Sequence, residues 1–150
     1  MEPKTTHSLD VVNLFWQYHN FMTNVYLADA QPDERLALRL MLKDLKMQVV
    51  GEGADWHTVI TQAPATNPDL LLVDWGLVAN GSGGSLSELR AACPPTVHII
   101  LISNFDTREQ AAVSTGADAF ISKTEMIEDV AKRLKEAAAA IRHRSLVRSG

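Results

Sequence analysis

The sequence has one cysteine, no long apolar run and no cluster of basic residues, and each shortage excludes a class of protein. Cys93, as the single cysteine, cannot form an intramolecular disulfide; it fits a reducing cytoplasm, and we expect a small buried hydrophobic residue. No apolar run reaches the roughly 18 residues of a membrane-spanning helix, so no membrane partner is expected. The N-terminus lacks the basic region and apolar stretch of a secretory signal. The net charge of −4 argues against direct nucleic acid binding by this chain.

The remaining composition is that of one ordinary globular domain. The 150 residues are 46% apolar and 21% charged, enough for a sizeable core. From residue 24 onward, short apolar runs rich in β-branched residues alternate with segments of helical periodicity. The expected strands cover 24–29, 47–52, 69–74, 97–103 and 118–123. The expected helices cover 32–45, 54–63, 85–93, 107–116 and 125–144.

Apolar residues at helical spacing predict the buried faces of these helices. In the helix 32–45 they are Leu36, Leu40, Met41 and Leu45. In the helix 54–63 they are Trp56, Val59 and Ile60. In the helix 125–144 they are Met126, Val130, Leu134 and Ala138.

Alternating strands and helices predict a parallel sheet covered by helices on both faces and joined by right-handed crossovers. In such an open sheet, ligands bind outside the carboxyl ends of the strands, at the topological switch point. The strand ends therefore hold the candidate functional residues.

The first, third, fourth and fifth expected strands end in Asp29, Asp74, Ser103 and Lys123. Two neighbouring carboxylates suit Mg²⁺, and a lysine and a hydroxyl can hold phosphoryl oxygens. The set suggests phosphoryl transfer with Asp74 as the nucleophile, which would form an acyl phosphate. Each residue alone could be a turn, a cap or a solvated side chain. Their joint occurrence at one sheet edge is the specific signal.

At these residues the sequence resembles a known family, the receiver domain of two-component response regulators, with the fold of the chemotaxis receiver. The resemblance covers 22–142. It rests on "VYLADAQP" (25–32), "PDLLLVDWGL" (68–77), "HIILISN" (98–104) and "GADAFISK" (116–123). It implies a single α/β domain, a flavodoxin-like (βα)5 doubly wound parallel sheet with strand order 2-1-3-4-5.

The resemblance also implies roles for individual residues. Asp74 would be the phospho-acceptor, and Mg²⁺ would be bound by Asp29, Asp74 and the backbone carbonyl of Gly76. Ser103 would be the switch hydroxyl, Phe120 the aromatic side chain that follows it, and Lys123 the partner of the phosphate. The chain would be a cytoplasmic phosphoprotein rather than an enzyme. Its partners would be a sensor histidine kinase or phosphotransfer protein and a downstream protein.

The sequence departs from the family pattern beside the first acid. Receivers usually carry two adjacent acids after the first strand, whereas here Ala30 follows Asp29. A charge about 4 Å from its partner is worth up to about 4 kcal/mol at an effective dielectric of 20, so Mg²⁺ binding should be weaker. Water or Gln31 could compensate in part. Further departures are Trp75, Val78, Thr124 and the glycine-rich loop after Asp74.

Two alternatives stay open. Ala30 favours a degenerate receiver, a protein-interaction module that works without phosphorylation. A flavin-binding domain on the same fold is disfavoured, because "AQPDE" stands where a Ser/Thr-rich phosphate loop would follow the first strand.

The two ends lie outside the receiver pattern. The segment 1–21 is expected to be an extension, helical from residue 8, which packs on the receiver or in a homodimer unless it is a mis-assigned upstream start. Residues 143–150 are expected to form a tail. A single-domain regulator and a fragment of a longer chain both remain open.

Overall fold

The computed structural model describes residues 22–79, 85–104 and 116–149. They form a five-stranded sheet in the order β2-β1-β3-β4-β5, and every neighbouring pair is parallel. The predicted flavodoxin-like topology is therefore confirmed. The strands are β1 (Asn24–Ala28), β2 (Gln48–Gly53), β3 (Leu70–Asp74), β4 (His98–Ser103) and β5 (Ala119–Ser122). The helices are α2 (Pro32–Asp44), α3 (Trp56–Ala65), α4 (Gly76–Ala79), α5 (Leu86–Ala92) and α7 (Ile127–Ser149).

Each described element lies close to its predicted range, with two differences. The short helix α4 directly follows the residue after Asp74, where a loop was expected. Helix α7 continues to Ser149, beyond its predicted end at residue 144, so it includes most of the segment 143–150. The predicted helix 107–116, the segment 1–21 and the loop 80–84 lie outside the described residues, apart from Gly116. Among the described helices, none is both long and apolar enough to cross a bilayer.

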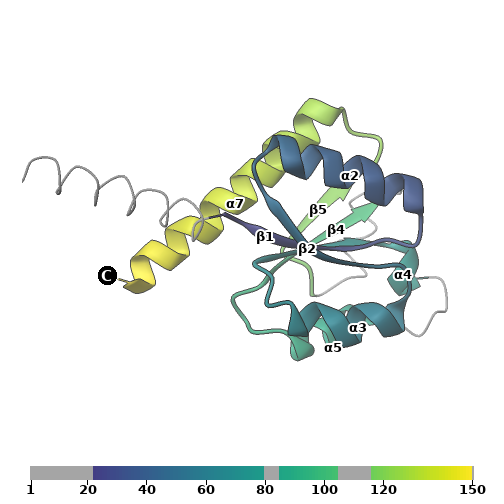
Figure 1. The fold of residues 1–150 in the computed structure, drawn as a ribbon, viewed down its shortest axis with the longest axis horizontal. Helices are drawn as coiled ribbons and strands as arrows, with labels where there is room; N and C mark the ends of the chain where they lie inside the picture. Colours follow the sequence, from purple (N-terminus) through teal and green to yellow (C-terminus); the bar gives the residue numbers. More distant parts are fainter. Residues whose placement is uncertain (1–21, 80–84, 105–115, 150) are drawn as a thin grey trace, which may run out of the picture.

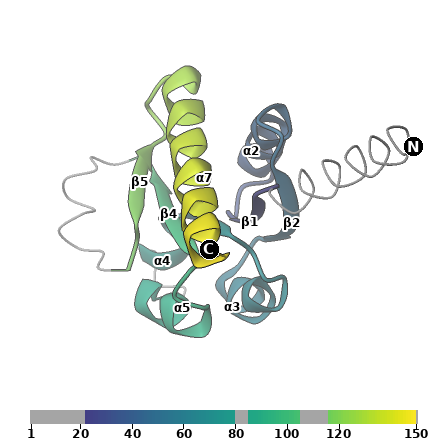
Figure 2. The same cartoon turned by 90° about the vertical axis from the view of Figure 1, so that its left-hand side faces the viewer.

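Helices cover the sheet on both faces (Figures 1 and 2). Helices α2 and α7 lie on one face, and α3, α4 and α5 lie on the other. Side chains of β3 alternate between the two layers: Leu70 and Leu72 join the core under α2 and α7, and Leu71 and Val73 join the opposite core. Both faces are buried, which explains why this strand reads as an unbroken apolar run.

The buried face of α2 differs from the predicted one. Leu36 and Leu40 are 48% and 57% exposed, so their assignment to the inner stripe is wrong. Leu42 is fully buried instead. The residues of α2 and its C-cap that pack around it are Leu38, Met41 and Leu45. Leucines occur on both sides of this helix, so apolar spacing alone could not fix its rotation.

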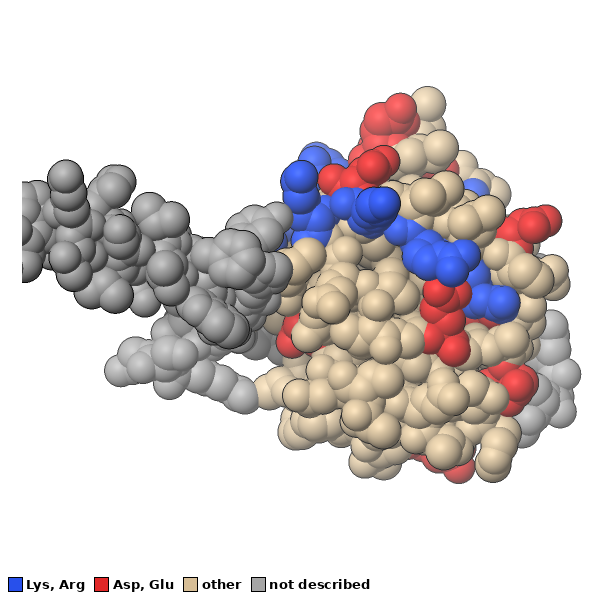
Figure 3. Space-filling view, in the orientation of Figure 1, with Lys and Arg blue, Asp and Glu red and all other residues tan. Residues whose placement is uncertain are grey.

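Ion pairs on the outer side of α2 fix that rotation. Arg35 Nε lies 3.3 Å from Glu52 Oε1, and Arg39 Nη1 lies 3.2 Å from Glu52 Oε2. Figure 3 shows Lys and Arg side chains in a band over this helix, with acids among them. With Arg35 and Arg39 turned toward β2, Glu34 stands in line with Leu38, four residues later, on the inner side.

Helix α7 packs through Leu134, Ala137 and Ala138, which are buried against the sheet. Met126 was expected on this stripe but is 68% exposed, and it lies just before α7, which begins at Ile127. The turn before the helix is closed by Ser122, whose backbone N–H donates to Glu125 Oε2 at 2.8 Å. That turn leaves Met126 outside the core.

The predicted small buried residue and the predicted face of α3 are confirmed. Cys93 is 6% exposed, and burial raises the pKa of its thiol. Trp56 and Val59 are buried, and Ile60 packs against them in part. Trp56 Nε1 also donates to Glu88 Oε1 at 2.9 Å, which joins α3 to α5.

A matched pair of truncations tests the orientation of α2. Leu42→Ala should lower the free energy of unfolding by about 2–5 kcal/mol, because it leaves a cavity in the core. Leu40→Ala, on the same helix but half-exposed, should change it by less than about 0.5 kcal/mol. Urea unfolding followed by circular dichroism measures both. Similar losses in the two variants would show that the described rotation of α2 is wrong.

Candidate functional site

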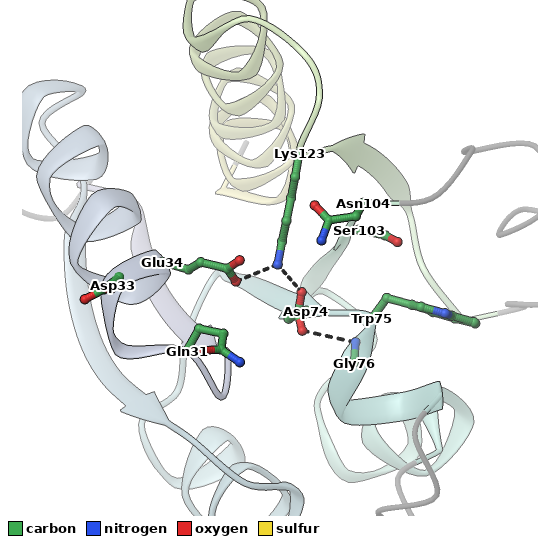
Figure 4. A pocket seen from close by; sticks show the side chains of 9 residues that line it. All are labelled: Gln31, Asp33, Glu34, Asp74, Trp75, Gly76, Ser103, Asn104 and Lys123. Atoms are coloured by element: carbon green, nitrogen blue, oxygen red, sulfur yellow. Dashed lines mark hydrogen bonds and ion pairs between the residues drawn. The ribbon is translucent and has the colours of Figure 1, made fainter.

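The carboxyl ends of the strands open into a pocket of about 500 Å³ (Figure 4). Asp74, Ser103 and Lys123, predicted from three different strand ends, all line it. Asp29 lies beside the pocket and is only 2% exposed. The other lining residues are Gln31, Asp33, Glu34, Trp75, Gly76 and Asn104.

The ammonium group of Lys123 is the centre of the site. Its Nζ lies 2.5 Å from Asp74 Oδ1, 2.5 Å from Glu34 Oε2 and 3.9 Å from Asp29 Oδ2. Burial alone would lower the pKa of Lys123. The hydrogen bonds to Asp74 and Glu34, with the charges of Asp74 and Asp29, outweigh burial and raise that pKa. The lysine is therefore charged and bridges three carboxylates.

Asp74 is held at both carboxylate oxygens. Oδ2 accepts a hydrogen bond from the Gly76 N–H at 3.1 Å, and Oδ1 faces Lys123 in the pocket (Figure 4). The side chain is 14% exposed, so it is accessible from the pocket. The Trp75 N–H donates to the Ile102 carbonyl at 2.8 Å and extends the pairing with β4 past the end of β3. These bonds fix the direction in which the carboxylate points.

Asp29 is a buried carboxyl group at the end of β1. Its Oδ1 accepts from the Gln31 N–H at 2.9 Å, which closes the turn into α2. Burial, followed by a hydrogen bond with Glu34 and the charge of Asp74, raises the pKa of Asp29 to about 7. The Gln31 N–H and Lys123 oppose this rise without cancelling it. The setting of Asp29 therefore favours its protonated form.

Glu34 is the site residue that sequence reasoning missed. It lies in the first turn of α2, and one carboxylate oxygen each from Asp29, Glu34 and Asp74 lie within 4.8 Å of one another. Burial would raise the pKa of Glu34, but hydrogen bonds with Asp29 and Lys123 and the charge of Lys123 lower it. Acids are common in the first turn of a helix, so the sequence offered no reason to place Glu34 in the site. Its position in line with Leu38 becomes a signal only once the rotation of α2 is known.

The other predicted residues are placed as follows. Ser103 is the last residue of β4 and is 1% exposed. Gly76 is the first residue of α4. Phe120 of β5 is partly buried and packs against the core under α3 and α5, and it does not line the pocket. The structure therefore brings together five of the predicted residues: Asp29, Asp74, Gly76, Ser103 and Lys123. Phe120 lies outside the pocket, against the core under α3 and α5.

The donor set fits a hard divalent cation. Three carboxylates offer oxygen ligands only, which Mg²⁺ prefers. The ammonium group of Lys123 already sits among these oxygens as a cation of the protein itself. The site therefore attracts positive charge and could hold a metal.

Comparison with known proteins decides the family. The sequence profile described as "Response regulator receiver domain" matches residues 25–135. This chain belongs to the response regulator receiver family. The receiver is 30% identical over 117 residues to the transcriptional regulatory protein YxjL of Bacillus subtilis. That match covers 76% of this chain and 53% of YxjL, so the chain spans about half the length of this curated relative.

Solved structures support the same fold. The receiver domain of RcsB from Salmonella enterica superposes with a TM-score of 0.65 at 19% identity, covering 80% of this chain and 98% of that one. The receiver domain of NarL from Mycobacterium tuberculosis gives 0.65 at 23% identity, covering 79% and 97%. Receivers of two-component systems are in general phospho-acceptors rather than enzymes. They typically bind Mg²⁺ and interact with histidine kinases and downstream effectors.

The raised pKa of Asp29 predicts a pH-dependent stability in the absence of metal. The native state holds this proton up to about pH 7, whereas the unfolded chain releases it near its ordinary value of 3.8. The unfolded state thus binds fewer protons between these values, and ionisation of Asp29 costs native stability as pH rises from about 4 to about 7. Asp29→Asn should therefore be more stable than the wild type at pH 8, by about 1–3 kcal/mol.

Urea unfolding in EDTA across pH 5 to 8 measures this difference. The advantage of the Asn variant should grow with pH and level off above about pH 7. A variant less stable than the wild type at pH 8, or an advantage that does not change with pH, would contradict the assigned pKa.

Proposed function

We propose that this receiver accepts a phosphoryl group on Asp74 from a sensor histidine kinase or a phosphotransfer protein, and that the acyl phosphate changes its affinity for a downstream partner. The observation that supports the proposal most directly is the setting of Asp74. One oxygen is fixed by the Gly76 N–H, and the other faces the pocket beside the Lys123 ammonium. This arrangement suits a nucleophile whose product must be held.

The proposed transfer is a displacement at phosphorus. A carboxylate oxygen of Asp74 attacks the phosphorus of the donor phosphohistidine, and an oxygen–phosphorus bond forms as the phosphorus–nitrogen bond breaks. The electron pair of that bond remains on the imidazole nitrogen, which takes up a proton. Lys123, already on the Asp74 carboxylate, pairs with the phosphoryl oxygens. Mg²⁺ bound by Asp29, Asp74 and the Gly76 carbonyl would neutralise phosphoryl charge.

Switching would follow from the new charge at the ends of β3 and β4. The hydroxyl of Ser103 would move toward the phosphoryl group, and Phe120 would reorient beside it. Phe120 pairs with Leu101 across β4 and β5, and its carbonyl accepts from Arg133 Nη1 of α7 at 3.3 Å. A change at Phe120 would therefore alter the contacts of β5 and α7. Together with the predicted helix 107–116, these elements are the proposed partner-binding surface.

The relatives supply context for the proposal. The RcsB receiver was solved in the presence of the phosphomimetic BeF3⁻, so the same reagent is a suitable probe for this chain. YxjL is a transcriptional regulatory protein, which makes transcription a candidate output of the pathway. A kinase donor would place the chain in the cytoplasm, as its single cysteine predicts.

A second candidate function rests on Ala30. With one of the two usual acids missing, the receiver could act as an interaction module that does not depend on phosphorylation. The three-carboxylate cluster favours phosphorylation instead, because it offers metal ligands that an inert module does not need.

Intact mass spectrometry tests the two candidates. The chain, incubated with a small-molecule phosphodonor and Mg²⁺, should gain one phosphoryl group, and EDTA should abolish the gain. Asp74→Asn should gain none, because the nucleophile is lost. The control Asp44→Asn changes an exposed acid at the end of α2 and should gain the group like the wild type.

The result also separates the alternatives. If Asp74→Asn gained a phosphoryl group to the same extent as the wild type, Asp74 would be rejected as the acceptor. No gain in the wild type, either from the small donor or from phosphorylated histidine kinases, would favour the interaction module.

A further inference from the structure

We infer that Glu34 supplies the carboxylate that is missing at Ala30, so that the divalent cation of this receiver is bound by Asp29, Glu34 and Asp74. The inference rests on the proposed function, since it concerns the cation of the same site. In the family pattern, the residue directly after Asp29 would supply this metal-binding carboxylate. Here we assign that role to a residue in the first turn of α2.

The path of the chain brings Glu34 to the correct edge. Ala30 is exposed and its methyl group cannot bind a metal. The backbone then turns at Gln31, whose N–H donates to Asp29 Oδ1, and α2 starts at Pro32. Glu34 is thus only five residues from Asp29, yet its carboxylate returns to the ends of β1 and β3.

Anchors on both sides of Glu34 hold it over the pocket. Arg35, the next residue, donates from Nη1 to the Asp29 carbonyl at 2.6 Å and pairs with Glu52 on the outer side. On the inner side, Leu38 and Leu42 continue the same stripe into the core. The backbone that carries Glu34 therefore has little freedom to turn its side chain away from the pocket (Figure 4).

The distances suit one ion. The three ligand oxygens lie within 4.8 Å of one another. Oxygens on opposite sides of a Mg²⁺ ion, each at about 2.1 Å, are about 4.2 Å apart. Small side-chain adjustments would therefore bring Asp29, Glu34 and Asp74 into one coordination sphere.

Lys123 marks where positive charge is stable in the absence of metal. Its Nζ contacts Glu34 Oε2 and Asp74 Oδ1, and Asp29 is the next nearest acid. A cation bound by these carboxylates would compete with Lys123 for them. The ammonium group of Lys123 could then pair with the oxygens of a phosphoryl group on Asp74.

The test is a Mg²⁺ titration of the full chain at constant ionic strength, followed by tryptophan fluorescence, since Trp75 lines the pocket, and by the Mg²⁺-dependent rise in melting temperature. Glu34→Gln keeps the shape of the side chain and removes the charge. It should raise the Kd for Mg²⁺ by about tenfold or more, since the loss of supporting groups around a metal already costs about 10- to 100-fold.

Two further variants distinguish a ligand from a general charge effect. Asp33→Asn removes an acid from the same turn of α2, and its side chain points away from Asp74 in Figure 4, so the Kd should change by less than about threefold. Ala30→Asp, added to Glu34→Gln, restores an acid beside Asp29 and should recover most of the lost affinity. Glu34→Asp, with a shorter carboxylate, should fall between Gln and the wild type.

The outcomes separate this inference from the proposed function. A wild-type Kd in folded Glu34→Gln, an equal loss in Asp33→Asn, or a wild type that does not respond to Mg²⁺ would overturn the role of Glu34. The gain of a phosphoryl group on Asp74 is measured by mass on the wild-type chain, so it tests the proposed function whether or not Glu34 is a ligand of the cation.

Discussion

The site depends on one interaction, the ammonium group of Lys123 among three carboxylates. Lys123 follows β5, Asp74 ends β3 and Glu34 lies in the first turn of α2, so this contact joins three elements that are distant in sequence. Without the ammonium, Glu34 and Asp74 would face each other as like charges in a partly buried pocket. The lysine is positioned by the sheet itself, because its backbone N–H donates to the Ser103 carbonyl at 2.7 Å and continues the pairing of β5 with β4.

In this arrangement the acids of the site outnumber the one ammonium group among them. One ammonium cannot neutralise three ionised acids, and the raised pKa of Asp29 is the response of the most buried of them. The protein thus holds a carboxyl group in a setting that disfavours its ionised form. Functional sites often contain groups whose ionised form is destabilised in this way. A cation that binds beside such a group stabilises its ionised form. The cost of ionising Asp29 and the attraction of the pocket for positive charge have the same electrostatic origin.

The sheet and the strand-end residues could be predicted because their signals are local. Buried parallel strands are unbroken apolar runs, and the polar residue that ends each run must lie at the carboxyl edge. The rotation of α2 could not be predicted in this way. Leu36 and Leu40 repeat at helical spacing as well as Leu38 and Leu42 do, and the choice between them depends on Arg35 and Arg39 reaching Glu52 in another element.

Glu34 escaped prediction for the same reason. Its place in the pocket follows from the rotation of α2, and the choice of Leu36 and Leu40 as the inner stripe turns it away from the sheet. A motif comparison looks for an acid at a fixed position in the chain, and Ala30 is not an acid. A cation responds instead to oxygen atoms in space, whichever element carries them. In this receiver, Ala30 offers no carboxylate beside β1, and a carboxylate on the following helix lies close to Asp29 and Asp74 instead. This placement favours a rearranged site over a degenerate one.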